Sequence, residues 1–209
     1  MKFALISGSH RPTGNSGRIA QHIAGLLEGQ GHSTSVLDLA TTELPFWDEG
    51  LWGAEGLKDK WQTQWEPVKS ELASADAYII VAPEYHGMAP SKLTNLFLLL
   101  GNGDVVAHKP VLIVTVSAGP VNGAYPVAEL RSFSTKNNRM VYIPEHLIVR
   151  NAGDMFLPET KPEHEASNAY LTERLHWLLA MLTDYAEAFL TLRAKGHTQV
   201  PSPKFANGM

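Results

Sequence analysis

The chain has 209 residues, of which 44% are hydrophobic and 18% charged, and its formal net charge is −4. This length and composition predict one globular domain with a sizeable core rather than a disordered segment. The mild acidic charge offers no basic surface for nucleic acid, and the absence of cysteine excludes disulfides, thiolate catalysis and cysteine-bound iron–sulfur clusters.

The N-terminal residues enter an apolar run at once, without the layout of a signal peptide. No apolar run approaches the roughly 18 residues needed to span a bilayer. We therefore expect a cytoplasmic protein with no membrane partner.

Strand-like and helix-like segments alternate along the chain. Residues 2–7 predict a buried strand, and a helix is expected from Ser16 to about residue 28 because apolar side chains recur at i, i+4, i+7 and i+8. Residues 33–39 predict a second strand near an edge of the sheet. The least regular part is 40–65, and its tryptophans suit either a lid over a planar substrate or, as we expect, packing beneath a long loop. These tryptophans are Trp47, Trp52, Trp61 and Trp65.

Further elements continue the alternation. Residues 77–82 predict a third strand, and residues 110–116, nearly all β-branched, predict a fourth strand buried on both faces. The remaining predicted elements are a short helix around Val68 and Leu72, a helix opening near Ser91, a helix of about 124–136, a fifth strand around 140–149 and a long helix from about 167 to 193. Residues 196–209 are expected to form a flexible tail.

This alternation predicts an α/β fold with one doubly wound, five-stranded parallel sheet, because parallel neighbours require crossover connections. Right-handed crossovers narrow the choice of topology further. No repeat or linker divides the chain, so residues 1–195 are expected to form a single domain.

The loop after the first strand has the parts of a phosphate cradle. Gly8 and Gly14 let the backbone approach a ligand closely, and the following helix directs unpaired N–H groups at the same space. Polar donors complete the loop: Ser9, Arg11, Thr13, Asn15 and Ser16. The loop matches neither Gly-x-Gly-x-x-Gly nor a Walker motif, which disfavours a dinucleotide Rossmann site and a P-loop nucleotidase. The alternative is a structural loop in which Ser16 caps the helix and Arg11 is solvated.

Two further loops end buried strands. In the loop from Pro83 to Pro90, exposed N–H groups are suited to the pyrimidine edge of a flavin and Tyr85 to packing beside a ring. The alternative makes Tyr85 a core residue and His86 a surface turn residue. The loop at residues 117–120 either lines the same ligand or is an ordinary turn.

Together these residues resemble the NADPH-dependent FMN reductase family. The resemblance covers Phe3 to roughly Met155 and rests on Ser7-Gly8-Ser9-x-Arg11, on Pro83-Glu84-Tyr85-His86-Gly87 with Pro90 and Asn95, and on Ser117-Ala118-Gly119 with Leu130-Arg131. It implies a flavodoxin-like fold with strand order 2-1-3-4-5 and a bound FMN.

The resemblance also implies which residues bind the cofactor. Ser9, Arg11, Asn15 and Ser16 would hold the FMN phosphate; Pro83, Glu84, Tyr85, His86 and Gly87 would wrap the isoalloxazine ring; Ser117 and Gly119 would close the third side. The family usually has Asn where His86 stands. As the one titratable side chain expected at the flavin edge, His86 is a candidate for tuning the reduced state.

The function implied is an FMN-dependent NAD(P)H oxidoreductase, in which NADPH or NADH reduces the flavin and a quinone, azo compound, free flavin or metal oxyanion takes the electrons. The flavin carries the chemistry, so no catalytic side chain and no metal is expected. The resemblance further implies homodimers or tetramers. The alternative is a flavodoxin-type electron carrier or a flavin-binding sensor, although the near-balanced charge offers a carrier little for docking.

Overall fold

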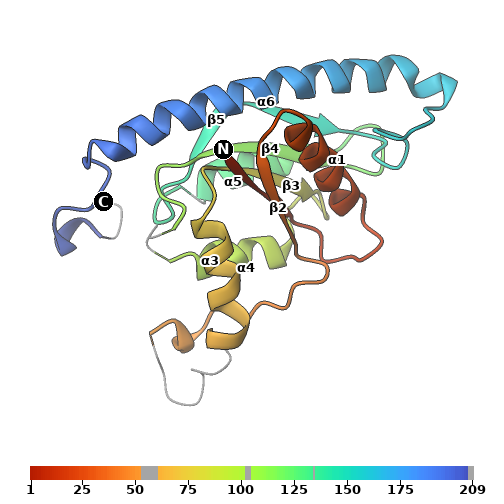
Figure 1. Ribbon diagram of the computed structural model, residues 1–209. Helices are drawn as coiled ribbons and strands as arrows, with labels where there is room; N and C mark the ends of the chain where they lie inside the picture. Colours follow the sequence, from red (N-terminus) through yellow and green to blue (C-terminus); the bar gives the residue numbers. More distant parts are fainter. Residues whose placement is uncertain (53–60, 102–104, 134, 207–209) are drawn as a thin grey trace.

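The computed structural model describes residues 1–52, 61–101, 105–133 and 135–206 (Figure 1). Its centre is a five-stranded parallel sheet in the order β2-β1-β3-β4-β5. The strands are β1 (Lys2–Ser7), β2 (Ser33–Asp38), β3 (Ala77–Pro83), β4 (Pro110–Val116) and β5 (Val141–Val149). The predicted fold class and strand order are therefore confirmed.

Helices cover both faces of the sheet (Figure 1). On one face pack α1 (Asn15–Gly29) and the long α6 (Glu165–Ala194). On the other face pack α3 (Glu66–Ala73), α4 (Ser91–Leu99) and α5 (Tyr125–Phe133). Every residue of β3 and β4 is buried, as expected for central parallel strands whose two faces are both covered.

The irregular segment before α3 contributes to the hydrophobic core between the sheet and α3, α4 and α5. Trp61 and Trp65, in a short π-helical turn (Trp61–Trp65), are buried against this core, so for these two the packing interpretation holds. Trp47 is partly exposed. Residues 53–60 and the side chain of Trp52 lie outside the described residues, as do residue 134 of the predicted helix and residues 207–209 of the predicted tail.

The segment after α6 folds back on the domain as far as residue 206. Arg139 donates hydrogen bonds from its guanidinium to the carbonyls of Phe205 (3.0 Å) and Ala206 (2.8 Å). The Phe205 carbonyl belongs to a short 3₁₀ turn (Pro203–Phe205). Within the described ranges, no helix combines the length and the hydrophobicity that crossing a membrane would require.

A buried lysine lies at the amino end of the sheet. Lys109 is 9% exposed and donates from Nζ to the carbonyl of Ala73 (2.8 Å) and to the hydroxyl of Tyr78 (3.3 Å). Burial, with a contribution from the charge of Arg193, lowers the pKa of Lys109 to about 8. Burial also raises the pKa of Tyr78, whose hydroxyl donates to the carbonyl of Leu72.

We expect this lysine to give the protein a pH-dependent stability. The folded chain releases the Lys109 proton near pH 8 and the unfolded chain near pH 10.5, so the unfolded state binds more protons in that window and stability rises with pH. Urea unfolding from pH 7 to pH 9.5 should show a gain of about 1–2 kcal/mol in the wild type relative to Lys109→Met. Parallel pH profiles for the two proteins would contradict the assignment.

Candidate functional site

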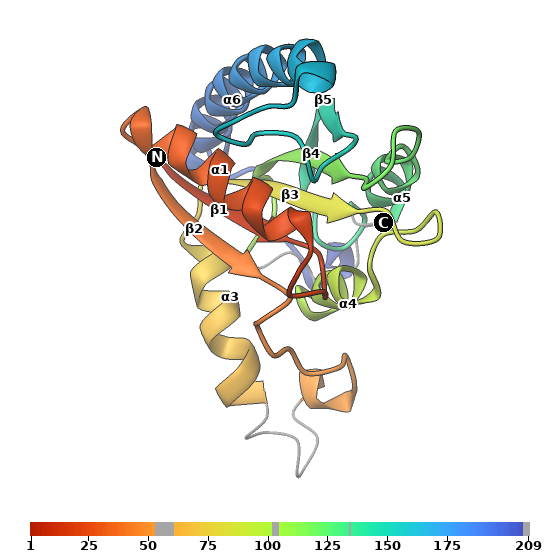
Figure 2. The same cartoon turned by 90° about the vertical axis from the view of Figure 1, so that its right-hand side faces the viewer.

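Three loops meet at the carboxyl edge of the sheet. They follow β1 (residues 8–14), β3 (84–90) and β4 (117–124), which are neighbours in the sheet, and all three strands end at the same side (Figure 2). The chain reverses its winding direction between β1 and β3, because β2 lies on one side of β1 and β3 on the other. Open α/β sheets bind ligands outside the strand ends at this kind of switch point.

The first loop is tied to the second through Ser9. The buried Ser9 hydroxyl accepts from the backbone N–H of Arg11 (3.0 Å) and is hydrogen-bonded to the hydroxyl of Tyr85 (2.8 Å). Backbone bonds close the loop on either side, from Gly8 N–H to the carbonyl of Val81 (2.8 Å) and from Gly14 N–H to the carbonyl of Arg11 (2.9 Å). The two loops therefore form one connected wall.

The beginning of α1 has unused hydrogen-bonding capacity. The helix starts at Asn15, with Gly14 as its N-cap and no side chain capping it, so the alternative in which Ser16 caps the helix does not hold. The Ser16 hydroxyl is buried and makes no hydrogen bond within the described chain. No acidic residue lies in the first turn. A buried, unpaired hydroxyl at a positive helix end fits a phosphate oxygen, and the exposed Arg11 lies in the same loop.

The second loop is a tight turn that presents backbone amides. Tyr85 and Met88 exchange two backbone hydrogen bonds of 3.0 Å, and φ is +53° at His86 and +78° at Gly87, as in a type I′ turn. The amides of His86 and Gly87 have no partner among the residues described. The His86 side chain is exposed, while Tyr85 is half-buried with its ring edge-on to His10 at 5.1 Å. The turn can therefore offer N–H donors to the edge of a flat ring.

Two carboxylates fasten this turn to α5. Glu84 accepts from the N–H groups of Gly123 (2.8 Å) and Tyr125 (3.3 Å), at the start of α5. In return, Glu129 of α5 accepts from the N–H of Ala89 (2.6 Å), just after the turn. The carboxylate of Glu84 is thus engaged with the third loop, and Glu129, which sequence reasoning missed, completes a reciprocal brace. No sequence signal marked Glu129, because a glutamate in a predicted helix is an ordinary residue.

We expect Glu129→Ala to weaken FMN binding about 10-fold, because the freed Ala89 amide loosens the turn. Glu129→Gln keeps a carbonyl acceptor and should retain most of the affinity. Titration of FMN against the fluorescence of the free flavin measures both, with Glu173→Ala on the exposed face of α6 as the matched control. Wild-type affinity in Glu129→Ala would remove the brace from the site.

The third loop is supported from behind by the segment after β5. Ser117 is buried, its hydroxyl accepts from the N–H of Gly119 (3.2 Å), and its carbonyl accepts from the N–H of Ala152 (3.0 Å). The carbonyl of Gly119 accepts from the N–H of Asn151 (3.2 Å). The predicted residues Ser117 and Gly119 therefore belong to a loop held in a defined position.

Arg18 on α1 anchors that supporting segment. Its guanidinium donates to the carbonyls of Ala152, Met155 and Phe156. Partial burial lowers the pKa of Arg18, but the group stays charged because arginine ionises far above neutral pH. Sequence analysis missed Arg18. The available signal was a charged residue between the buried positions Ser16 and Ile19 of an amphipathic helix.

Asn95 of α4 is hydrogen-bonded to the segment that follows β2. Its side chain donates to the carbonyl of Pro45 (2.9 Å) and accepts from the N–H of Trp47 (2.9 Å). Phe46, between these two contacts, is left largely exposed. Both ends of this buried amide are therefore satisfied by hydrogen bonds within the chain.

The site as a whole is a set of hydrogen-bond donors at the carboxyl edge of the sheet. It offers a helix N-terminus with a free hydroxyl, an exposed guanidinium and a turn with free amides. Hydrogen bonds connect the first loop to the second and the second loop to the third. In the described ranges, no group of three or more His, Cys, Asp or Glu side chains is placed to hold a metal ion. The arrangement is suited to binding and orienting an anionic, flat-ringed ligand.

Comparison with protein families gives a match over residues 1–154 to the family described as NADPH-dependent FMN reductase. Two curated relatives are an NADPH azoreductase from Bacillus sp. (strain OY1-2), 30% identical over 123 residues, and an FMN-dependent NADPH-azoreductase from Staphylococcus saprophyticus, 28% identical over 131 residues. The aligned regions cover 59% and 63% of this chain. They span 62% and 68% of the two relatives.

Among solved structures, the fold is similar to that of FerB, a flavoenzyme NAD(P)H:(acceptor) oxidoreductase from Paracoccus denitrificans. The TM-score is 0.66 at 19% identity, covering 90% of this chain and 98% of FerB. An oxidoreductase from Corynebacterium diphtheriae gives a TM-score of 0.60 at 15% identity, covering 91% and 96% of the two chains. At these identities the likeness establishes the fold.

Proposed function

Because the chain belongs to the NADPH-dependent FMN reductase family, we propose that it is an FMN-dependent NAD(P)H oxidoreductase that delivers electrons to a small organic acceptor. Family membership implies FMN as the cofactor and NAD(P)H as the reductant. The chain matches less than two thirds of the length of the first curated relative.

The free hydroxyl of Ser16 at the start of α1 is the observation that carries this proposal. A buried hydroxyl without a partner is costly unless a ligand supplies one. We infer that Ser9, Arg11, Asn15 and Ser16 surround the FMN phosphate. Ser9 keeps the loop closed through Tyr85 and the Arg11 amide, which leaves the hydroxyl of Ser16 and the helix amides for the ligand.

The remaining site residues orient the ring. Bound FMN would accept a hydride from the nicotinamide and pass electrons onward, and the chain supplies position and electrostatics. The amides of His86 and Gly87 would bond the polar edge of the ring, while Glu84 and Glu129 keep their turn fixed. Ser117 and Gly119 would close the third side.

For the acceptor, we propose an azo compound or a quinone. The names of the two curated relatives, both azoreductases, support the azo compound. The second candidate function, a flavodoxin-type electron carrier, would use the same cofactor site without direct nicotinamide turnover. The net charge of −4 gives little surface charge for docking a protein partner and favours the enzyme.

Anaerobic addition of NADPH to FMN-loaded protein tests the proposal through the visible absorbance of the flavin. We expect bleaching much faster than that of free FMN, followed by recovery of the absorbance when an azo dye or a quinone is added. A flavin that binds but stays oxidised would instead support the electron carrier. Failure of FMN to bind would reject both.

A further inference from the structure

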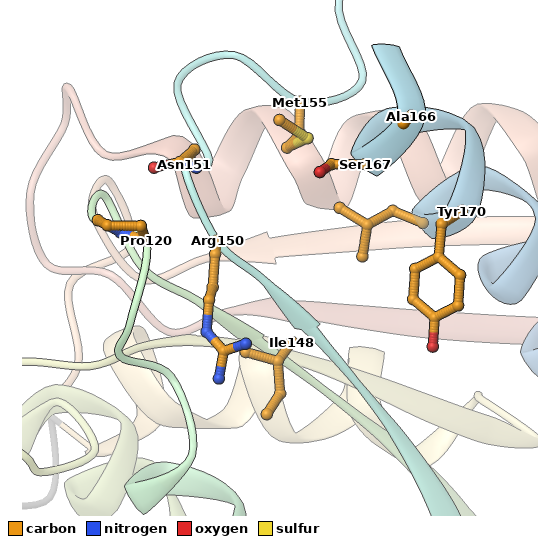
Figure 3. A pocket seen from close by; sticks show the side chains of 9 residues that line it. Pro120, Ile148, Arg150, Asn151, Met155, Ala166, Ser167 and Tyr170 are labelled. Carbon is orange, nitrogen blue, oxygen red and sulfur yellow. The ribbon is translucent and has the colours of Figure 1, made fainter. Parts of the chain in front are cut away.

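A hollow lies beside the third loop of the candidate flavin site. It has a volume of ≈ 460 Å³ and is enclosed by the end of β5, the segment that follows it and the first turns of α6 (Figure 3). Its wall includes the apolar side chains of Ile148, Met155 and Leu171. The proposed flavin contacts use none of these residues.

Arg150 supplies a guanidinium with free donors to this hollow. Its Nε donates to the carbonyl of Asn122 (3.0 Å), which fixes the direction of the side chain. The two terminal nitrogens have no hydrogen-bond or carboxylate partner in the described part of the chain. A planar guanidinium held at one nitrogen and open at the other two matches the oxygens of a phosphate.

Tyr170, with its aromatic ring and hydroxyl, and the hydroxyl of Ser167 complete the lining from α6. Tyr170 is 60% exposed and lines the hollow from α6, while Arg150 lines it from the end of β5 (Figure 3). The Ser167 hydroxyl lies one turn before Tyr170 in the same helix. Nucleic bases stack readily on such aromatic side chains. A stacking ring and a free guanidinium that line the same hollow are suited to a phosphorylated nucleoside.

The hollow and the flavin site share a wall. Pro120 of the third loop lines the hollow, and the N–H of Asn151 donates to the carbonyl of Gly119 in the same loop. A ligand that reaches across this loop can therefore contact both sites. NADPH has a nicotinamide at one end and an adenosine with a 2′-phosphate at the other, and it is the reductant named by the family.

We propose that this hollow binds the 2′-phosphorylated adenosine of NADPH, with Arg150 contacting the phosphate and Tyr170 contacting the base. The inference rests on the proposed function, whose reductant it concerns. Arg150 then determines the preference for NADPH over NADH, because an arginine near the ribose is the usual means of accommodating the 2′-phosphate.

The kinetic test compares NADPH and NADH as reductants of wild type and Arg150→Met. Loss of a charge-assisted contact should lower kcat/KM for NADPH about 10- to 100-fold, mainly through KM, and change the NADH values less than about twofold. Arg150→Lys should restore part of the NADPH value. Lys195→Met, at the other end of α6, is the matched control and should match wild type with both nucleotides.

A binding test needs no turnover. Calorimetric titration of FMN-loaded wild type should show adenosine 2′,5′-bisphosphate binding more tightly than adenosine 5′-monophosphate, and Arg150→Met should lose that difference. Tyr170→Ala should weaken both ligands. Inorganic phosphate serves as the third titrant, and affinity for it equal to that for the bisphosphate would identify a free-anion site and overturn the proposal.

Two other results would also overturn it: an equal loss with NADPH and NADH in Arg150→Met, or unchanged bisphosphate binding in that variant. Failure of the proposed function gives a different pattern. In that case the wild type oxidises neither nucleotide, while the titrations still determine whether the hollow recognises the 2′-phosphate.

Discussion

Gly14→Ala is expected to weaken FMN binding by up to about 100-fold while the sheet stays folded. A Cβ at this position would lie 2.6 Å from the Ser9 hydroxyl and 3.0 Å from the carbonyl of Arg11. Ser9 must then rotate, which breaks its bonds to Tyr85 and to the Arg11 amide and opens the wall between the two loops. Overpacking of this kind typically costs about 1–3 kcal/mol.

The measurement combines FMN titration with urea unfolding. Gly25→Ala in the same helix is the matched control, because a Cβ there meets nothing within 4 Å. It should leave FMN affinity unchanged and raise the unfolding free energy by about 0.5–1 kcal/mol, the usual gain for an exposed helical glycine. Tight FMN binding by Gly14→Ala would mean that the first loop does not hold the phosphate.

Arg18→Met is expected to lower the free energy of unfolding by about 3 kcal/mol and to weaken FMN binding as well. The substitution keeps a long apolar side chain but leaves the carbonyls of Ala152, Met155 and Phe156 without their charged donor. The segment that supports the third loop then loses its anchor to α1.

Urea unfolding followed by circular dichroism measures the loss of stability, and amide exchange of residues 151–156 reports whether the segment is released. Gln21→Met, on the exposed face of the same helix, controls for adding a methionine to α1. Protection of this segment equal to that of wild type would contradict the anchoring role.

The fold could be predicted from the sequence because its signals are local. The buried run at 110–116 and the alternation of strand and helix periods need no knowledge of distant residues, and β4 coincides with its predicted range. The three loops were also expected at one edge of the sheet, because parallel strands end there, and the family resemblance implied that their strands are neighbours. The assignment of individual residues to FMN stays a prediction.

The bonds that organise the site were not predictable in this way. Whether Glu84 faces a ligand or the start of α5 depends on where Gly123 lies, 39 residues away. Ser16 was expected as a possible cap, but the helix begins one residue earlier and leaves its hydroxyl free. Such details arise from tertiary packing, to which a single sequence gives little access.

The hydrogen bonds between the loops have a consequence for how the chain folds during its synthesis. The Ser9–Tyr85 contact spans 76 positions, the Ala89–Glu129 contact 40, and the contact between Arg18 and Ala152 134. Contacts of such long range form late, since loop closure must precede them. On the ribosome, the nascent chain can therefore complete these three contacts only after β5 and the residues beyond it have emerged. We expect cofactor uptake to coincide with completion of the domain.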